Sequence, residues 1–371
     1  MKNKALFILH LSPPVHGASK VGDTILSSKI INQSLDSKYI RITSSKKLDL
    51  IGQFNFQKIF YFVILFFKVL YALLTFRPTI IYFTASSFGI AFYRDFVLSI
   101  PIKLYCCFSE CQVFYHYHAK GIYAFTSSSK RARFLTNCFV KGANLIFISE
   151  LMSNEIKLIK GYHNVIYLKN GVDNNMNENE FNILLTTRKK SDKINVLYLS
   201  NMMLDKGYDT VLDLAQKMKS TNSQNKIQFH FAGGWSSDQD KLAFNNYVRK
   251  HRLDDIVTYH GLVEGEIKKE LFKLAHVFIF PSIYKKEVFP LSVLEALSYG
   301  IPVLAFNVGA VTQIINNTNS LITDKEHIYE AFNTLTDSYL NSDTYIKCRQ
   351  KFMKNFRATI FEENLLSILK T

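Results

Sequence analysis

The segment from Pro281 to Gly309, PSIYKKEVFPLSVLEALSYGIPVLAFNVG, constrains the fold more than any other part of the chain. Its centre is predicted to be a short helix, because Pro290 stands where a helix begins and Gly300 where one ends. Leucines recur between them at a spacing of three. The apolar runs on either side, Val277–Phe280 and Val303–Phe306, are predicted to be buried strands. This order predicts a β-α-β unit and therefore a parallel sheet.

Two acidic residues of this segment, Glu287 and Glu295, are candidates for ligand binding. Ligands of parallel sheets lie beyond the carboxyl ends of the strands, where the free N–H groups from Leu291 to Val293 would face a phosphate. Glu287 lies in the entering loop and Glu295 about a turn and a half into the helix, so both side chains reach such a ligand. Carboxylates repel phosphate and should accept hydrogen bonds from hydroxyls, which a nucleotide sugar offers at both ends. The alternative is a solvated helix edge.

The stretch EVFPLSVLEALSYGIPVLA resembles the signature of the retaining family 4 glycosyltransferases. The resemblance implies the α/β GT-B fold, in which two Rossmann-like domains with parallel sheets face each other across a cleft. It implies that Glu287 contacts the donor sugar and Glu295 the nucleotide ribose. Phe289, Pro290 and Leu291 belong to the donor-binding segment that the same resemblance predicts.

Further donor-binding residues are predicted in the second half of the chain. The family has a loop that begins Gly-Arg and ends Lys-Gly and grips the donor diphosphate; Lys206 matches its lysine, whereas Asn201 replaces its arginine and supplies no charge. Gly234 follows a predicted strand and is expected near the nucleotide, and Val263 lies in a segment that resembles the base-binding one. The acidic triplet Asp238–Asp240 is interpreted as the start of a helix. No metal and no cofactor besides the donor are expected.

The first half offers two candidates at the ends of predicted strands. Gly17 follows the apolar strand Ala5–Leu11 and would let the backbone approach a ligand, or it is a plain turn. His116 and His118 follow another strand, and a metal site with Cys111 is only weakly supported because no fourth ligand has a recognised spacing. The resemblance implies that His118 faces the donor sugar; the alternative is a structural histidine.

Basic charge is concentrated in the first half of the chain. Residues 1–175 contain 21 Lys and Arg against 8 Asp and Glu, a balance of +13 out of the total of +15. The segment Phe56–Phe76 is almost long enough to span a bilayer but carries Lys68, and a partly embedded helix is favoured over a spanning or a fully buried one. Because no nucleic-acid module accompanies the charge, an anionic membrane surface is the expected partner, and nucleic acid is not.

The chain is expected to form domains at 1–173 and 193–350, with a polar linker at 174–192 and a last helix at 351–371 that crosses back to the first domain. Five cysteines without a CxxC motif fit free thiols in the cytoplasm. We expect a protein peripheral to the inner face of the cytoplasmic membrane.

The predicted function is that of a retaining hexosyltransferase. The donor is expected to be UDP-hexose or UDP-N-acetylhexosamine, and the acceptor a polyprenyl-diphosphate-linked saccharide of O-antigen, lipopolysaccharide or capsule synthesis. The alternatives are a GT-B sugar-nucleotide epimerase, a dinucleotide-dependent oxidoreductase, and a non-catalytic membrane-associated assembly protein. The oxidoreductase is disfavoured because the first loop lacks the G-x-G-x-x-G pattern.

Overall fold

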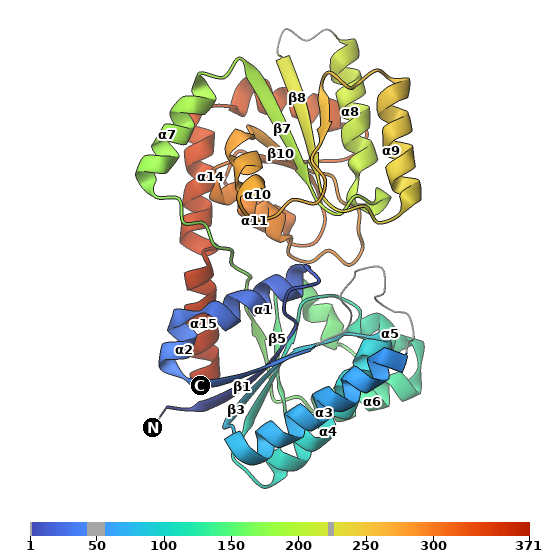
Figure 1. Ribbon diagram of the computed structural model, residues 1–371, viewed down its shortest axis with the longest axis vertical. Coiled ribbons are helices and arrows are strands. Elements are labelled where there is room, and N and C mark those ends of the chain that lie inside the picture. Colours follow the sequence, from blue (N-terminus) through green and yellow to red (C-terminus); the bar gives the residue numbers. More distant parts are fainter. Residues whose placement is uncertain (1, 43–55, 222–225) are drawn as a thin grey trace. The chain divides into compact units, whose positions relative to one another are not determined.

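A computed structural model of the chain describes residues 2–42, 56–221 and 226–371. The chain divides into unit 1, Met1–Gly171 with Ala358–Thr371, and unit 2, Val172–Arg357. Within the described residues each unit has one parallel sheet of six strands (Figure 1). The predicted α/β class with two Rossmann-like parallel-sheet domains is confirmed.

Unit 1 has the strand order β2-β1-β3-β4-β5-β6. Its strands are β1 (Lys4–Leu9), β2 (Asp36–Arg41), β3 (Ile80–Ala85), β4 (Gln112–Tyr117), β5 (Asn144–Phe147) and β6 (Asn164–Tyr167). Its helices are α1 (Gly17–Ser27), α2 (Lys29–Ser34), α3 (Phe56–Phe76), α4 (Gly89–Cys107), α5 (Ile122–Ser128), α6 (Lys130–Val140), the 3₁₀ segment η2 (Glu150–Ile156) and α15 (Ala358–Lys370).

Unit 2 has the strand order β12-β11-β10-β7-β8-β9. Its strands are β7 (Lys193–Leu199), β8 (Lys226–Ala232), β9 (Val257–Tyr259), β10 (Val277–Phe280), β11 (Val303–Phe306) and β12 (Leu321–Thr323). Its helices are α7 (Glu178–Lys189), η3 (Leu204–Lys206), α8 (Tyr208–Ser220), α9 (Asp238–Lys250), α10 (Gly265–Leu274), α11 (Leu291–Ser298), α12 (Val311–Ile315), α13 (Ile328–Thr334), η4 (Leu335–Tyr339) and α14 (Ser342–Asn355). The predicted β-α-β unit around α11 is therefore present.

Alternation along the central strands explains how each sheet is buried on both faces. In unit 1, Phe7 and Leu9 point to one face of β1, where they cluster with Val21 of α1 and with Phe361 and Leu365 of α15. In unit 2, Val196 and Tyr198 of β7 point to the face that α8, α9 and α13 cover. Burial of side chains of this size contributes about 1.5–3 kcal/mol each, so these faces supply most of the stability of each unit.

The stretch 174–192, which we expected to be a polar linker, contains α7. Asn177 caps this helix and forms a capping box with Glu180. Its buried residues lie at the helical spacing i, i+3, i+4 and i+7, namely Phe181, Leu184, Leu185 and Arg188. This stripe is hard to recognise in the sequence, because polar residues lie between its members and its last member is an arginine.

The C-terminal residues form two helices, α14 and α15, rather than one. α15 packs on α2, and the Ser28 hydroxyl donates a hydrogen bond of 2.7 Å to the carboxylate of Glu362. Residues 358–371 therefore belong to unit 1 by their contacts.

Gly233, which follows β8, provides a test of how the loops of unit 2 are packed. Its φ is +148°, and a Cβ built there would lie 1.8 Å from the carbonyl oxygen of Ser200. Gly233→Ala should lower the stability of unit 2 by roughly 1–3 kcal/mol, because backbone must move to admit the methyl group. The neighbouring Gly234→Ala is the matched control, since its Cβ would meet only a Leu262 methyl group at 3.8 Å. Equal urea midpoints for the two variants would contradict this packing.

Candidate active site

The predicted donor-binding residues of unit 2 follow the carboxyl ends of four neighbouring strands. Asn201 and Lys206 come after β7, Gly234 after β8 and Val263 after β9. Glu287 follows β10 in the loop that leads to α11. Since all six strands are parallel, these loops emerge at the same edge of the sheet. We name this edge the donor edge.

Lys206 and Glu287 form an ion pair at the donor edge. The Lys206 Nζ donates a hydrogen bond to Glu287 Oε2, and the side chains are only 14% and 13% exposed. The Lys206 Nζ also lies 4.6 Å from the centroid of the Tyr284 ring. A partly buried charge pair of this kind gives a ligand both a cation for a phosphate and a carboxylate for a hydroxyl.

The backbone holds this ion pair in place. Gly207 has φ +78°, and a Cβ there would lie 2.4 Å from the carbonyl oxygen of Pro281, so this position tolerates only glycine without a shift. The carbonyl of Asp205 accepts a hydrogen bond of 2.9 Å from the Ile283 N–H. The loops after β7 and β10 are thereby fixed against each other, and Lys206 is fixed next to Glu287.

The N-terminus of α11 faces the same edge. Pro290 is its N-cap and makes no side-chain capping hydrogen bond, so the first N–H groups of the helix have no side-chain partner from that residue. Glu295 lies in the second turn, and its Oε1 accepts a hydrogen bond of 2.6 Å from the Lys268 Nζ. The helix end therefore presents unused donors to an anion, with a carboxylate beside them.

Three further predicted residues differ in how accessible their side chains are. Phe289 is 6% exposed and packs on Phe356 with ring centroids 6.0 Å apart, so its side chain belongs to the core and only its backbone is available to a donor. Asn201 is exposed, and its carbonyl accepts a hydrogen bond from the Met203 N–H. Val263 is 8% exposed. The acidic triplet lies in the first turn of α9, which Ser237 caps, as we interpreted it.

In unit 1 the structure distinguishes the two histidines that follow β4. His116 is fully buried and hydrogen-bonded through Nδ1 to the hydroxyl of Tyr82, which makes it a structural residue. His118 lies with its ring centroid 4.0 Å from that of His116, and both of its ring nitrogens are buried without a hydrogen-bond partner. Gly17 is the first residue of α1, and nothing lies within 4 Å of a Cβ built there.

Other histidines gather around His118 at the carboxyl edge of this sheet. His16 caps α1 by accepting a hydrogen bond from the Ser19 N–H, and its ring centroid lies 5.7 Å from that of His10. Burial first, then the charge of Arg94 and smaller electrostatic contributions of His16 and His118, hold the pKa of His10 well below its usual value. Among the described residues no group of three or more His, Cys, Asp or Glu is arranged to hold a metal ion.

Sequence reasoning missed Lys268, Tyr284 and His10. Lys268 lies on α10, far from Glu295 along the chain, and no motif predicts their pairing. Tyr284 lies within the segment from Pro281 to Gly309, but its ring contact with Lys206 depends on the fold of the loop. His10 comes directly after β1, and its position at a strand end was the available signal.

Residues 182–359 match the family described as glycosyl transferases group 1. This part of the chain is therefore similar to glycosyltransferase group 1 domains. It contains Lys206, Glu287 and Glu295, and also Lys268, which pairs with Glu295. The donor edge therefore lies within the residues that match this family.

Two curated relatives match parts of the chain. Alpha-galactosylglucosyldiacylglycerol synthase of Streptococcus pneumoniae is 26% identical over 165 residues, which are 44% of this chain and 41% of the relative. O-antigen chain mannosyltransferase B of Escherichia coli is 30% identical over 95 residues, which are 26% of this chain and 23% of the relative. The chain thus spans less than half the length of these relatives.

The likeness to a solved structure covers the whole chain. HepE of Anabaena, solved in complex with UDP and glucose, has a TM-score of 0.68 at 15% identity and covers 100% of both chains. At this identity the likeness shows the fold alone, which is the two-domain GT-B fold that we predicted.

The buried imidazole of His118 gives a prediction for pH. Burial, with a smaller contribution from His16, lowers the pKa of His118 to about 3 from its usual 6.5. Because the unfolded state then binds the proton more tightly, the stability of unit 1 should fall as the pH drops below about 6.5. The loss at pH 5 should be roughly 2 kcal/mol for this residue.

Urea unfolding at pH 7 and pH 5 measures this effect. His118→Gln cannot titrate and should lose less stability between the two pH values than the original protein. An equal loss in both proteins would show that His118 does not carry the effect. At pH 7 His118 is neutral, so it can exchange a hydrogen bond with a sugar hydroxyl but supplies no positive charge.

Proposed function

We propose that the protein is a retaining glycosyltransferase that moves a hexosyl group from a UDP-sugar to a lipid-linked saccharide in surface-polysaccharide synthesis. One observation carries the proposal: the ion pair of Lys206 and Glu287 lies at the donor edge that the N-terminus of α11 also faces, within the residues that match glycosyl transferases group 1. The choice of UDP is supported by HepE of Anabaena, which shares the fold and was solved with UDP bound. The names of the two curated relatives support the acceptor: one refers to a diacylglycerol lipid and the other to the O-antigen chain, a surface polysaccharide.

The donor edge provides a residue or a helix end for each part of the hexosyl transfer. The acceptor hydroxyl oxygen forms a bond to the anomeric carbon, and the bond from that carbon to the diphosphate breaks with its electron pair left on the phosphate oxygen. Lys206 and the N–H groups of α11 stabilise this charge. The acceptor proton passes to the leaving phosphate on the same face of the sugar, which retains the configuration. Glu287 accepts hydrogen bonds from the sugar hydroxyls, and Glu295 from those of the ribose.

Substitution of Glu287 tests the role of its carboxylate in the transfer reaction. Glu287→Gln keeps the size of the side chain but removes its charge, and it should lower the transfer rate by roughly 10²–10³-fold. Glu326→Gln, on an exposed residue of unit 2, is the matched control and should leave the rate unchanged. The measurement is release of UDP from a panel of UDP-sugars with a polyprenyl-diphosphate saccharide. Full activity of Glu287→Gln in folded protein would overturn the assignment, and sugar conversion without acceptor would indicate an epimerase.

The membrane part of the proposal rests on α3 and α4. Among the described residues one helix, Ile59–Phe76, is long and apolar enough to cross a membrane by length and composition. One stripe of it is buried in unit 1, at Leu65, Val69, Ala72 and Leu73. Its opposite stripe is exposed, with Phe60, Phe67, Tyr71 and Leu74 each at least 60% accessible.

α4 packs beside α3 (Figure 1). It also carries exposed apolar side chains. Its exposed residues include Ile90, Ile100 and Leu104, and Phe108 follows its end with 84% of its surface exposed. A helix that is packed on one side and apolar on the other suits insertion to part of its depth, not a span across the bilayer. The basic excess of residues 1–175 favours an anionic surface, on which a lipid-linked acceptor would be held.

A vesicle experiment tests this surface. The triple variant Phe60→Ser, Phe67→Ser and Leu74→Ser should reduce binding to vesicles of phosphatidylglycerol and phosphatidylcholine at least about tenfold, because three apolar side chains no longer leave water. Ile183→Ser with Leu242→Ser, on exposed apolar residues of unit 2, is the control and should bind normally. Equal binding of the triple variant and the original protein would contradict the proposal.

A further inference from the structure

Three polar side chains form a hydrogen-bonded row across the sheet of unit 2. Asn195 lies on β7, His230 on the neighbouring β8, and His260 directly after β9, which is next to β8. The Asn195 Oδ1 lies 3.1 Å from the His230 Nε2, and the His230 Nδ1 lies 3.0 Å from the His260 Nε2. Because His260 follows the last residue of β9, this row ends at the donor edge.

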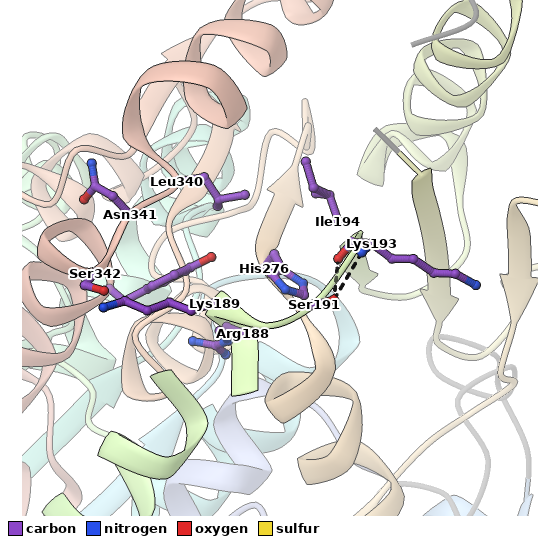
Figure 2. Close-up of a pocket in the computed structure, with 10 residues that line it drawn as sticks. Arg188, Lys189, Ser191, Lys193, Ile194, His276, Leu340, Asn341 and Ser342 are labelled. Carbon is purple, nitrogen blue, oxygen red and sulfur yellow. Dashed lines mark hydrogen bonds between the residues drawn. The ribbon is translucent and has the colours of Figure 1, made fainter. Parts of the chain in front are cut away.

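The row lies on a face of the sheet whose neighbouring face is apolar. On β8, Phe229 and Phe231 point to the face that α8, α9 and α13 cover, so His230 points to the other face. Buried polar groups cost free energy unless they are hydrogen-bonded, and the row satisfies this condition from one strand to the next. At its other end the Asn195 N–H donates a hydrogen bond of 3.1 Å to the Nδ1 of His276, which lines the pocket drawn in Figure 2.

The order of donors and acceptors fixes where each ring carries its proton. An amide oxygen only accepts, so the His230 Nε2 carries the proton and donates to Asn195. Burial, with a smaller contribution from His260, lowers the pKa of His230 to about 4, and burial also lowers the pKa of His260. Both rings are therefore neutral at pH 7, and the His230 Nδ1 accepts from the Nε2–H of His260. This leaves the Nδ1 of His260 without a proton, as an acceptor.

This acceptor nitrogen is open to a ligand. Among the described residues none donates a hydrogen bond to the His260 Nδ1, and this atom is not buried. The loop that follows is also open, since Leu262 is 70% exposed. Within the described parts of the chain nothing accepts a hydrogen bond from the N–H of Leu262 or Val263. The end of β9 thus offers one acceptor and two backbone donors at the donor edge.

The same loop leads into α10, which contacts α11. Lys268, in the first turn of α10, donates a hydrogen bond of 2.6 Å to the Oε1 of Glu295. Glu295 is the carboxylate to which the proposed function assigns the ribose. The loop after β9 therefore adjoins the ribose position, as a base attached to that ribose requires.

We propose that His260 selects the nucleobase of the donor, by accepting at Nδ1 the hydrogen bond that the N3–H of uracil donates. This inference rests on the proposed UDP-sugar donor and adds the residue that distinguishes uracil from cytosine. The N3 of cytosine carries no hydrogen, so its lone pair would face that of Nδ1. The N–H groups of Leu262 and Val263 donate to the uracil carbonyls. His230 and Asn195 are positioning residues, because they keep the proton of His260 on Nε2.

Calorimetric titration of the full chain with UDP and with CDP tests this role. The original protein should bind UDP at least about tenfold more tightly than CDP. His260→Leu should weaken the binding of UDP about tenfold and leave that of CDP nearly unchanged, because only UDP loses a hydrogen bond. His327→Leu, on an exposed histidine of unit 2, is the matched control and should change neither affinity.

Two further variants separate the Nδ1 of His260 from the rest of the ring. His260→Asn places an amide oxygen near the position of Nδ1 and should keep most of the preference for UDP. His260→Gln places its amide near the position of Nε2 and should lose that preference. Unchanged thermal melting of the three variants without ligand establishes that they are folded.

The outcomes separate this inference from the proposed function. A preference for UDP that His260→Leu leaves unchanged would overturn the role of His260 and leave the UDP-sugar donor standing. A loss of equal size for UDP and CDP would also overturn it, since it would indicate a structural role. Equal effects of His260→Asn and His260→Gln would exclude Nδ1 as the acceptor. No binding of UDP by the original protein would overturn the UDP donor itself, and this inference with it.

Discussion

Gly207 meets the backbone of Pro281 so closely that no side chain fits between them. This contact joins the loop after β7 to the loop after β10, and it brings Lys206 and Glu287 together although 81 residues separate them in the sequence. A second close approach, of Gly309 to the carbonyl oxygen of Val288, holds the loop after β11 against the same segment. The parallel sheet brings the loops to one edge, and these glycines decide how near they come. The charge arrangement of the donor edge follows from backbone packing.

Much of unit 2 was predictable from the sequence, because its signals are local. The strands around α11, the start of that helix at Leu291 and its end near Gly300 follow from proline, glycine and leucine placement. The position of Lys206 after β7 was also predictable. The partner of Glu295 was not, since Lys268 reaches it from α10, where nothing in the sequence distinguishes it from the other lysines of that helix. α7 was not predicted, because its buried stripe ends in Arg188, and arginine does not contribute to a hydrophobic pattern.

Unit 1 shows a different limit. The helix Phe56–Phe76 was predicted with its observed bounds, because twenty-one largely apolar residues leave little choice. Which of its faces meets the sheet depends on the three-dimensional packing, and only the structure shows Val69 and Ala72 buried while Phe67 and Leu74 are exposed. Likewise, the position of His116 and His118 at the end of a strand was predictable from the sequence, but the hydrogen bond between Tyr82 and His116 was not.

Arg188 also contacts the C-terminal end of α11. Its guanidinium donates to the carbonyl of Tyr299, the C-cap of that helix, and Arg349 donates to the carbonyl of Ser298, its last residue. Two buried cations thus compensate the negative pole of a helix only eight residues long, whose positive pole faces the donor edge. A diphosphate at the donor edge would therefore meet a short helix whose opposite end is already held and neutralised inside unit 2.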